Sequence, residues 1–129
     1  MKDFVKYDLA LRLKEKGFIT TEPFAIYQLE DIDTIYPLYT SDPYYYDLDD
    51  FDEYSFVAPT ISQVLKWLRE DNKLYIGVTL YQYLDKYKFY PTIQHMDKME
   101  QIMFVNNDVY SSYEEAALAG IKYVLDNLI

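Results

Sequence analysis

Apolar residues recur at helical spacing in three segments of the chain, residues 3–16, 60–72 and 112–128. The first segment stops at Gly17, and glycine is the usual left-handed helix terminator. The other two open with capping-box pairs, Thr60 with Gln63 and Ser112 with Glu115, which satisfy the first amides of a helix. We therefore expect three helices whose buried stripes are Val5, Leu9 and Leu13; Ile61, Val64, Leu65 and Leu68; and Tyr113, Ala117, Ile121, Val124 and Leu128.

Alternating residues predict strands between these helices. Residues 24–29 and 34–39 form one strand pair, and Pro37 should keep the second strand at a sheet edge because proline cannot donate to a ladder. Residues 74–83 and 86–94 alternate more regularly, and only Leu84 and Asp85 separate them, which predicts an antiparallel hairpin. Residues 102–105 add one further strand.

The two faces of this predicted hairpin differ in chemistry. The face expected in the core carries Leu74, Ile76, Val78 and Leu80, with Tyr87, Phe89 and Ile93 from the second strand. The opposite face carries Tyr75, Tyr81, Tyr83 and Tyr90. Tyrosine offers a large contact area at little cost in side-chain entropy, so this tyrosine face is either an interaction surface or a second side of the core that helices cover.

The elements follow one another in the order helix, strand, strand, helix, strand, strand, an additional strand, helix. This order predicts an α+β fold in which an antiparallel sheet of about four to five strands is covered by three helices. A chain of 129 residues without repeats or linkers is expected to form a single domain, residues 1–129, with a long acidic, tyrosine-rich loop at about 40–57.

Charge is concentrated in one part of the chain. The sequence has 22 acidic and 12 basic residues and a net charge of -10. Residues 17–65 contain no Lys or Arg and carry all of this excess, since the segments before and after contribute +2 and -2. The densest part mixes carboxylates with aromatic rings, and we expect it to bind a partner through Asp42, Tyr44, Tyr45, Tyr46, Asp47, Asp49, Asp50, Asp52, Glu53 and Tyr54.

Three interpretations of residues 42–54 remain open from the sequence. They form a solvated loop whose aromatic rings pack under the domain, a recognition loop for a protein with a basic surface, or a calcium site. The calcium interpretation lacks the glycine and the twelve-residue spacing of an EF-hand loop. In the second interpretation, the carboxylates could also imitate nucleic-acid phosphates in the groove of a nucleic-acid-binding protein.

The residues suited to catalysis are few. Cysteine is absent, which excludes disulfides and thiolate metal sites, and His95 is the only side chain that ordinarily titrates near neutrality. No nucleophile elbow, P-loop or dinucleotide fingerprint is present. We expect no cofactor, no bound metal, no membrane span and, because acidic residues dominate, no direct binding of nucleic acid. The alternative function is a small carboxylate-dependent, metal-assisted hydrolase with acids gathered around His95.

Three short stretches carry a resemblance to known sequences: residues 13–18 (LKEKGF), residues 58–60 (APT) with 67–70 (WLRE), and residues 110–116 (YSSYEEA). Together they resemble a family of small uncharacterised proteins of gut Bacteroidetes bacteria and their phages. The resemblance implies a cytoplasmic protein of phage or prophage type in a bacterial host cell. It implies no activity, because none is established for the family. The combined expectation is a non-enzymatic accessory protein that binds a basic protein partner, with a homo-oligomer as a further option.

Overall fold

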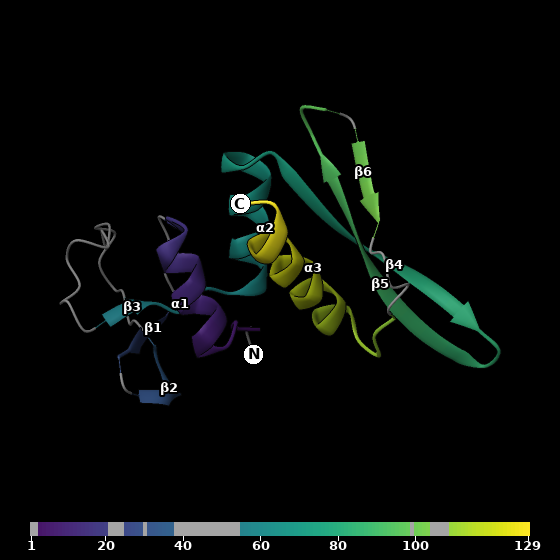
Figure 1. The fold of residues 1–129 in the computed structure, drawn as a ribbon. Helices are drawn as coiled ribbons and strands as arrows, with labels where there is room; N and C mark the ends of the chain where they lie inside the picture. The colour runs from purple at the N-terminus through teal and green to yellow at the C-terminus, as the bar shows by residue number, and fades with distance from the viewer. Residues whose placement is uncertain (1–2, 21–24, 30, 38–54, 99, 104–108) are drawn as a thin grey trace. The chain divides into compact units, whose positions relative to one another are not determined.

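The computed structural model describes residues 3–20, 25–29, 31–37, 55–98, 100–103 and 109–129. Within these ranges the α+β class is confirmed (Figure 1). The chain divides into two compact units, Met1–Gln63 and Val64–Ile129. The elements are α1 (Tyr7–Glu15), β1 (Ala25–Gln28), β2 (Asp31–Pro37), β3 (Ser55–Val57), α2 (Ile61–Asp71), β4 (Leu74–Tyr83), β5 (Lys86–His95), β6 (Glu100–Met103) and α3 (Tyr113–Asn127).

The strands form two antiparallel sheets instead of one sheet of four to five strands. In the first unit the order is β2-β1-β3, and in the second it is β4-β5-β6. In the first sheet β1 is the central strand, and it pairs with β2 on one side and with β3 on the other. Pro37 lies on the outer strand β2, as predicted for a residue that lacks an amide hydrogen. The expectation of a single domain stays a prediction.

Helix α1 begins later than the sequence pattern indicates. Residues 3–5 pair instead with residues 59–61, and the Val5 amide donates to the Pro59 carbonyl at 2.9 Å. These backbone bonds hold residues 3–5 extended, so helical geometry starts only at Tyr7. At the other end the terminator is confirmed, because Gly17 adopts a φ of 85°.

Both predicted capping residues are confirmed. The Thr60 amide donates to Gln63 Oε1 at 3.0 Å, and the Gln63 amide donates to Thr60 Oγ1 at 3.2 Å, which is the reciprocal capping box. At α3, the Glu115 amide donates to Ser112 Oγ at 3.1 Å. The Glu115 carboxylate, however, accepts from the amide and hydroxyl of Ser111 instead of the Ser112 amide.

In the second unit, α3 packs against the aliphatic face of the β4–β5 hairpin. The strands pair without interruption from Leu74 opposite His95 to Tyr83 opposite Lys86. Gly120 of α3 lies so close to this face that an added Cβ would be 2.8 Å from Ile76 Cγ2 and 3.3 Å from Pro91 Cβ. The glycine therefore sets how closely helix and sheet approach one another.

Only the part of the aliphatic hairpin face near α3 is buried, although the alternating pattern runs along both strands. Ile76 and Ile93 are buried as expected, but Leu80 and Tyr87 on the same face are exposed. The turn end of the hairpin extends past α3, so the helix does not cover these residues (Figure 1). The expectation of a core position was wrong for Leu80 and Tyr87, because alternation identifies a face and not how far a helix covers it.

The alternatives for the tyrosine face are also decided in part. Tyr75 is 48% exposed and Tyr81 is 46% exposed, while Tyr90 is half-buried. Helix α3 lies on the opposite face, against Ile76 and Pro91. The tyrosine face is thus exposed to solvent at Tyr75 and Tyr81. The side chain of Tyr83 is not among those that the structure describes. None of the described helices is long and apolar enough to cross a membrane.

Replacement of Gly120 with alanine tests the close approach of α3 to the sheet. In a helix interior, alanine is ordinarily more favourable than glycine by about 1 kcal/mol. Here the added methyl meets Ile76 and Pro91, so we expect Gly120→Ala to lower the free energy of unfolding by about 1–2 kcal/mol. Chemical denaturation measures this change. In an Ile76→Ala background the same replacement should no longer destabilise, and an equal loss in both backgrounds would contradict the packing.

Candidate functional site

The predicted partner-binding residues lie outside the described part of the chain, as do all residues from 38 to 54. Their attachment points are nevertheless described. The stretch leaves the sheet after Pro37, at the end of β2, and returns at Ser55, the first residue of β3. The last three residues of the predicted loop, Ser55–Val57, form β3.

Strand β1 holds these two attachment points within one sheet. Pro37 pairs with Ala25, and Ser55 pairs with Gln28 on the other side of β1. Two inter-strand spacings and three residues along a strand separate the two Cα atoms by roughly 14 Å. The acidic stretch therefore starts and ends on the same small sheet.

An aromatic cluster joins this sheet to α1. Tyr7 of α1 makes edge-to-face contacts with Tyr27 at 5.5 Å and with Phe56 at 5.3 Å between ring centroids. Lys14 Nζ lies 5.6 Å from the centroid of the Phe56 ring, within the range of a cation–π interaction. The cluster thus links α1 to both β1 and β3.

The hydroxyl of Tyr27 completes this connection. It donates to the Val5 carbonyl at 2.6 Å, and both residues are buried. Burial raises the pKa of Tyr27, since the ionised form would lose its hydration. The hydroxyl therefore stays a donor to Val5 throughout the neutral range, and this bond ties β1 to the extended residues before α1.

Strand β2 carries Asp31 and Asp33, the described acidic residues of segment 17–65. Its pairing with β1 shifts between Ile26 and Gln28, and the next matched residue on β2 after Tyr36 is Asp31. Across this irregular part, the Tyr36 hydroxyl donates to Asp31 Oδ2 at 2.5 Å. The hydrogen bond joins the two ends of the shifted segment, residues 32–35.

Hydrogen bonds hold the pKa of Asp31 below its usual value. The largest contribution is the Tyr36 hydroxyl, followed by Thr34, and the Asp33 backbone also contributes. The same pair raises the pKa of Tyr36, because ionisation of the phenol would break its bond to a carboxylate and create a second negative charge beside it. Asp31 therefore remains negative at any pH where the protein's ordinary carboxylates are ionised.

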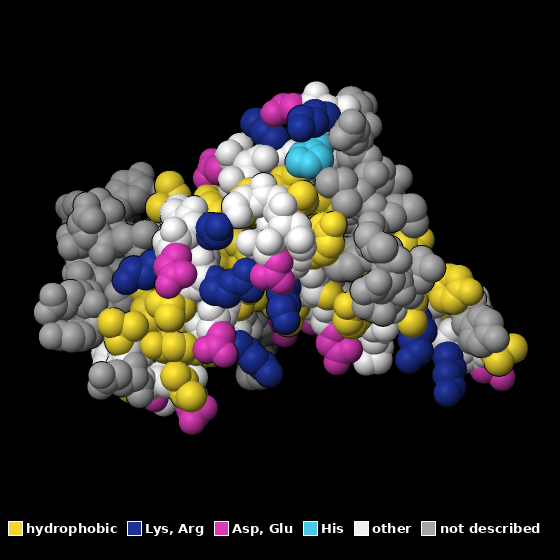
Figure 2. All heavy atoms as spheres, in the orientation of Figure 1, with side chains coloured by type: hydrophobic (Ala, Val, Ile, Leu, Met, Phe, Trp, Pro, Cys, Tyr) yellow, Lys and Arg dark blue, Asp and Glu magenta, His cyan; other side chains and the backbone are white. Residues whose placement is uncertain are grey.

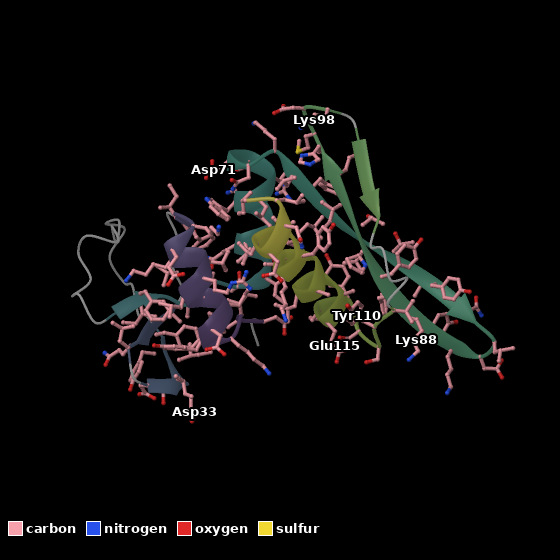
Figure 3. All side chains as sticks on the ribbon, viewed as in Figure 1. Asp33, Asp71, Lys88, Lys98, Tyr110 and Glu115 are labelled. Carbon is pink, nitrogen blue, oxygen red and sulfur yellow. The ribbon has the colours of Figure 1, made fainter. Side chains whose placement is uncertain are left out.

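The shifted segment presents acidic and aliphatic groups together. Ile32 is 60% exposed, and Asp33 and Thr34 are also exposed. Figure 3 shows the Asp33 side chain at the outer side of β2. Lysine and arginine have aliphatic stems and charged heads, so a surface of this kind suits a basic partner.

The sequence pattern places residues 30–33 between the two predicted strands, but Asp31, Ile32 and Asp33 belong to β2. The useful indication was the alternation of Asp31, Ile32 and Asp33, which has the two-residue period of a strand. The strand propensity of aspartate is low, so propensity alone does not indicate a strand here.

The described residues offer no metal centre. His95 is half-buried at the end of β5, where it pairs with Leu74 and Glu100 of the neighbouring strands. No group of three or more His, Cys, Asp or Glu side chains able to hold a metal ion occurs in the described residues. The convergence of acids on His95 that the hydrolase alternative requires is therefore not found within them.

Comparison of the chain with protein-family models, with curated proteins and with solved structures gives no match.

The bond between Asp31 and Tyr36 predicts a change in titration. In Tyr36→Phe the largest cause of the lowered pKa of Asp31 is removed, so we expect this pKa to rise toward its ordinary value of about 3.9. Carboxyl chemical shifts followed by NMR during acid titration measure the change. Tyr27→Phe is the matched control, because it removes a phenol bonded to Val5 and should leave the pKa of Asp31 unchanged.

The same pair fixes the sign of a pH effect on stability. Because the pKa of Asp31 is lower in the folded than in the unfolded chain, its contribution is present above the unfolded value and is lost as the pH falls through the folded value. Wild type and Tyr36→Phe should therefore converge in stability at low pH. An unchanged pKa of Asp31 in Tyr36→Phe would contradict the assignment.

Proposed function

We propose that the protein is a non-enzymatic binding protein that engages a protein partner with a basic surface through its acidic, tyrosine-rich residues 42–54. The observation that carries the proposal is the composition of residues 17–65, which hold the whole charge excess and no Lys or Arg. The phage or prophage origin is part of the proposal and rests on the family resemblance alone.

The described strand that precedes this stretch in the sequence supports the proposal. Strand β2 exposes Ile32 and Asp33, and hydrogen bonds keep Asp31 ionised. The proposed contact combines tyrosine rings with carboxylates, and a basic partner supplies lysine or arginine heads with aliphatic stems that pack on the rings. Carboxylates attract such a partner over a distance and also orient it.

In the most specific form of this proposal, the partner is a protein that normally binds nucleic acid. The carboxylates would then occupy positions that phosphates take in its groove. Duplex DNA should compete for such a partner, whereas it should not affect a partner recognised at another basic surface.

Neutralising the acidic stretch tests the proposed binding. In a pull-down from bacterial host lysate, we expect the variant with Asp47, Asp49, Asp50 and Asp52 changed to Asn to lose partners that the wild type retains. The physical reason is the loss of four charges from one short stretch, and raising the salt concentration should weaken wild-type binding in the same way.

A matched control separates local charge from net charge. Glu70→Gln with Asp71→Asn, Asp85→Asn and Asp97→Asn removes the same number of charges from exposed positions outside residues 17–65. This variant should keep the wild-type partners. Equal retention of partners by both variants, or equal loss by both, would count against the proposal.

A further inference from the structure

Strand β4, one of the two outer strands of the second sheet, differs from the other sheet edges. Open strand edges invite pairing with another chain, and native proteins protect them with short length, charged residues, proline or bulges. Strand β2 has Asp31, Asp33, Pro37 and an irregular register, β3 has three residues, and β6 has four residues that begin with Glu100. Each of these outer strands thus carries at least one protective feature.

Strand β4 carries none of these features. Its ten residues, LYIGVTLYQY, contain no charge and no proline, and they pair with β5 without a bulge. Among the described residues β4 pairs with β5 alone, because it is the outer strand of the order β4-β5-β6. The edge is also long, about 33 Å for ten residues.

The hydrogen-bond pattern identifies which residues of β4 point their backbone groups outward. The Met96 amide donates to the Lys73 carbonyl at 2.9 Å, so even-numbered residues of β5 bond to odd-numbered residues of β4. Phe89 exchanges both of its backbone hydrogen bonds with Tyr110 on the side of β5 away from β4. Odd-numbered residues of β5 therefore face away from β4, which agrees with the first observation. Within the described ranges, the amides and carbonyls of β4 that face away from β5 and have no strand partner are therefore those of Leu74, Ile76, Val78, Leu80 and Gln82.

These outward groups are centred on Val78, and the side chains around it are arranged symmetrically. Tyr75 and Tyr81 are equally far from Val78, as are Ile76 and Leu80. In an antiparallel pair of two β4 strands centred on Val78, Tyr75 would face Tyr81 of the second copy on the tyrosine face. On the aliphatic face, Ile76 would lie beside Leu80 of the second copy.

This symmetry selects a second copy as the occupant of the edge. We propose that two copies of the protein associate through antiparallel pairing of β4 with β4 about Val78, which joins their β4-β5-β6 sheets into one six-stranded sheet. The pairing covers Leu80, which is 55% exposed in one copy, and Tyr75 and Tyr81, which are about half exposed. About ten backbone hydrogen bonds would satisfy the free groups of both edges.

Charge does not prevent this contact. Strands β4 and β5 contain no acidic residue, although the chain has a net charge of -10. Figure 2 shows lysine and hydrophobic side chains together toward the turn end of the hairpin, and Asp85 of the turn lies outside the proposed pairing. The remaining repulsion between two acidic copies acts over a longer range, so salt should screen it.

The oligomeric state in solution tests the proposal. By light scattering or sedimentation at submillimolar concentration, we expect the wild type to have twice the monomer mass of 15.5 kDa. Thr79→Lys places a lysine on the exposed side of β4 next to the axis, where the two copies would repel, and should yield the monomer. Its NMR amide spectrum should show that the monomer remains folded.

The control makes the same replacement on the other sheet. Thr34→Lys changes an exposed threonine of the outer strand β2 and should leave the dimer intact. A wild type that is monomeric at high and low salt would overturn the proposal. So would a dimer that survives Thr79→Lys or one that Thr34→Lys also dissociates.

A single cysteine locates the axis, because the chain contains none of its own. In the proposed register two Val78→Cys chains would bring their Cα atoms to about 5.5 Å, a separation that a disulfide spans. Oxidation should cross-link Val78→Cys and not Tyr87→Cys on β5, and the opposite result would exclude this register.

The dimer and the binding of a basic partner can be distinguished by salt. Raising the salt concentration should strengthen the β4 dimer and weaken binding through residues 42–54. The replacements in residues 47–52 should not dissociate the dimer, and Thr79→Lys should not abolish binding of the partner. Each proposal can therefore fail without the other.

Discussion

The close approach of α3 to the β4–β5 hairpin at Gly120 determines much of the second unit. Because a Cβ at this position would collide with Ile76, only glycine allows the helix backbone to lie this near the sheet. This contact assigns the aliphatic face to the core near Ile76 and Pro91 and leaves the opposite face to Tyr75 and Tyr81. Among the described residues the outer edge of β4 has no strand partner, and this is the edge for which we infer a second copy.

The first unit depends on a different kind of contact. There the chain before α1 is extended, and the buried hydroxyl of Tyr27 binds the Val5 carbonyl beneath a cluster of aromatic rings. A phenol serves this purpose because its ring contributes apolar area while its hydroxyl satisfies a buried carbonyl. The small sheet held in this way carries both points at which residues 38–54 join the described chain.

The two proposed surfaces have opposite electrostatic character. The acidic stretch would attract the proposed basic partner over a distance, whereas pairing through the uncharged β4 would depend on backbone hydrogen bonds and apolar contact. A dimer formed through β4 would carry two acidic stretches in one assembly. Two linked sites raise the overall affinity for a partner with repeated basic surfaces, provided that both can engage simultaneously.

The sequence by itself determined three helices, the caps of α2 and α3 and the β4–β5 hairpin, because these depend on local periodicity and on residues such as Thr60 and Ser112 that bond nearby amides. It also located the charge of the chain in one stretch. It missed the late start of α1 and the strand β3. Only the tertiary structure decided that the strands divide into two sheets, that Asp31 and Asp33 lie in a strand, and that Leu80 is exposed. These outcomes depend on which distant segments pair and how far a helix reaches across a sheet, and alternation along one strand contains no information about either.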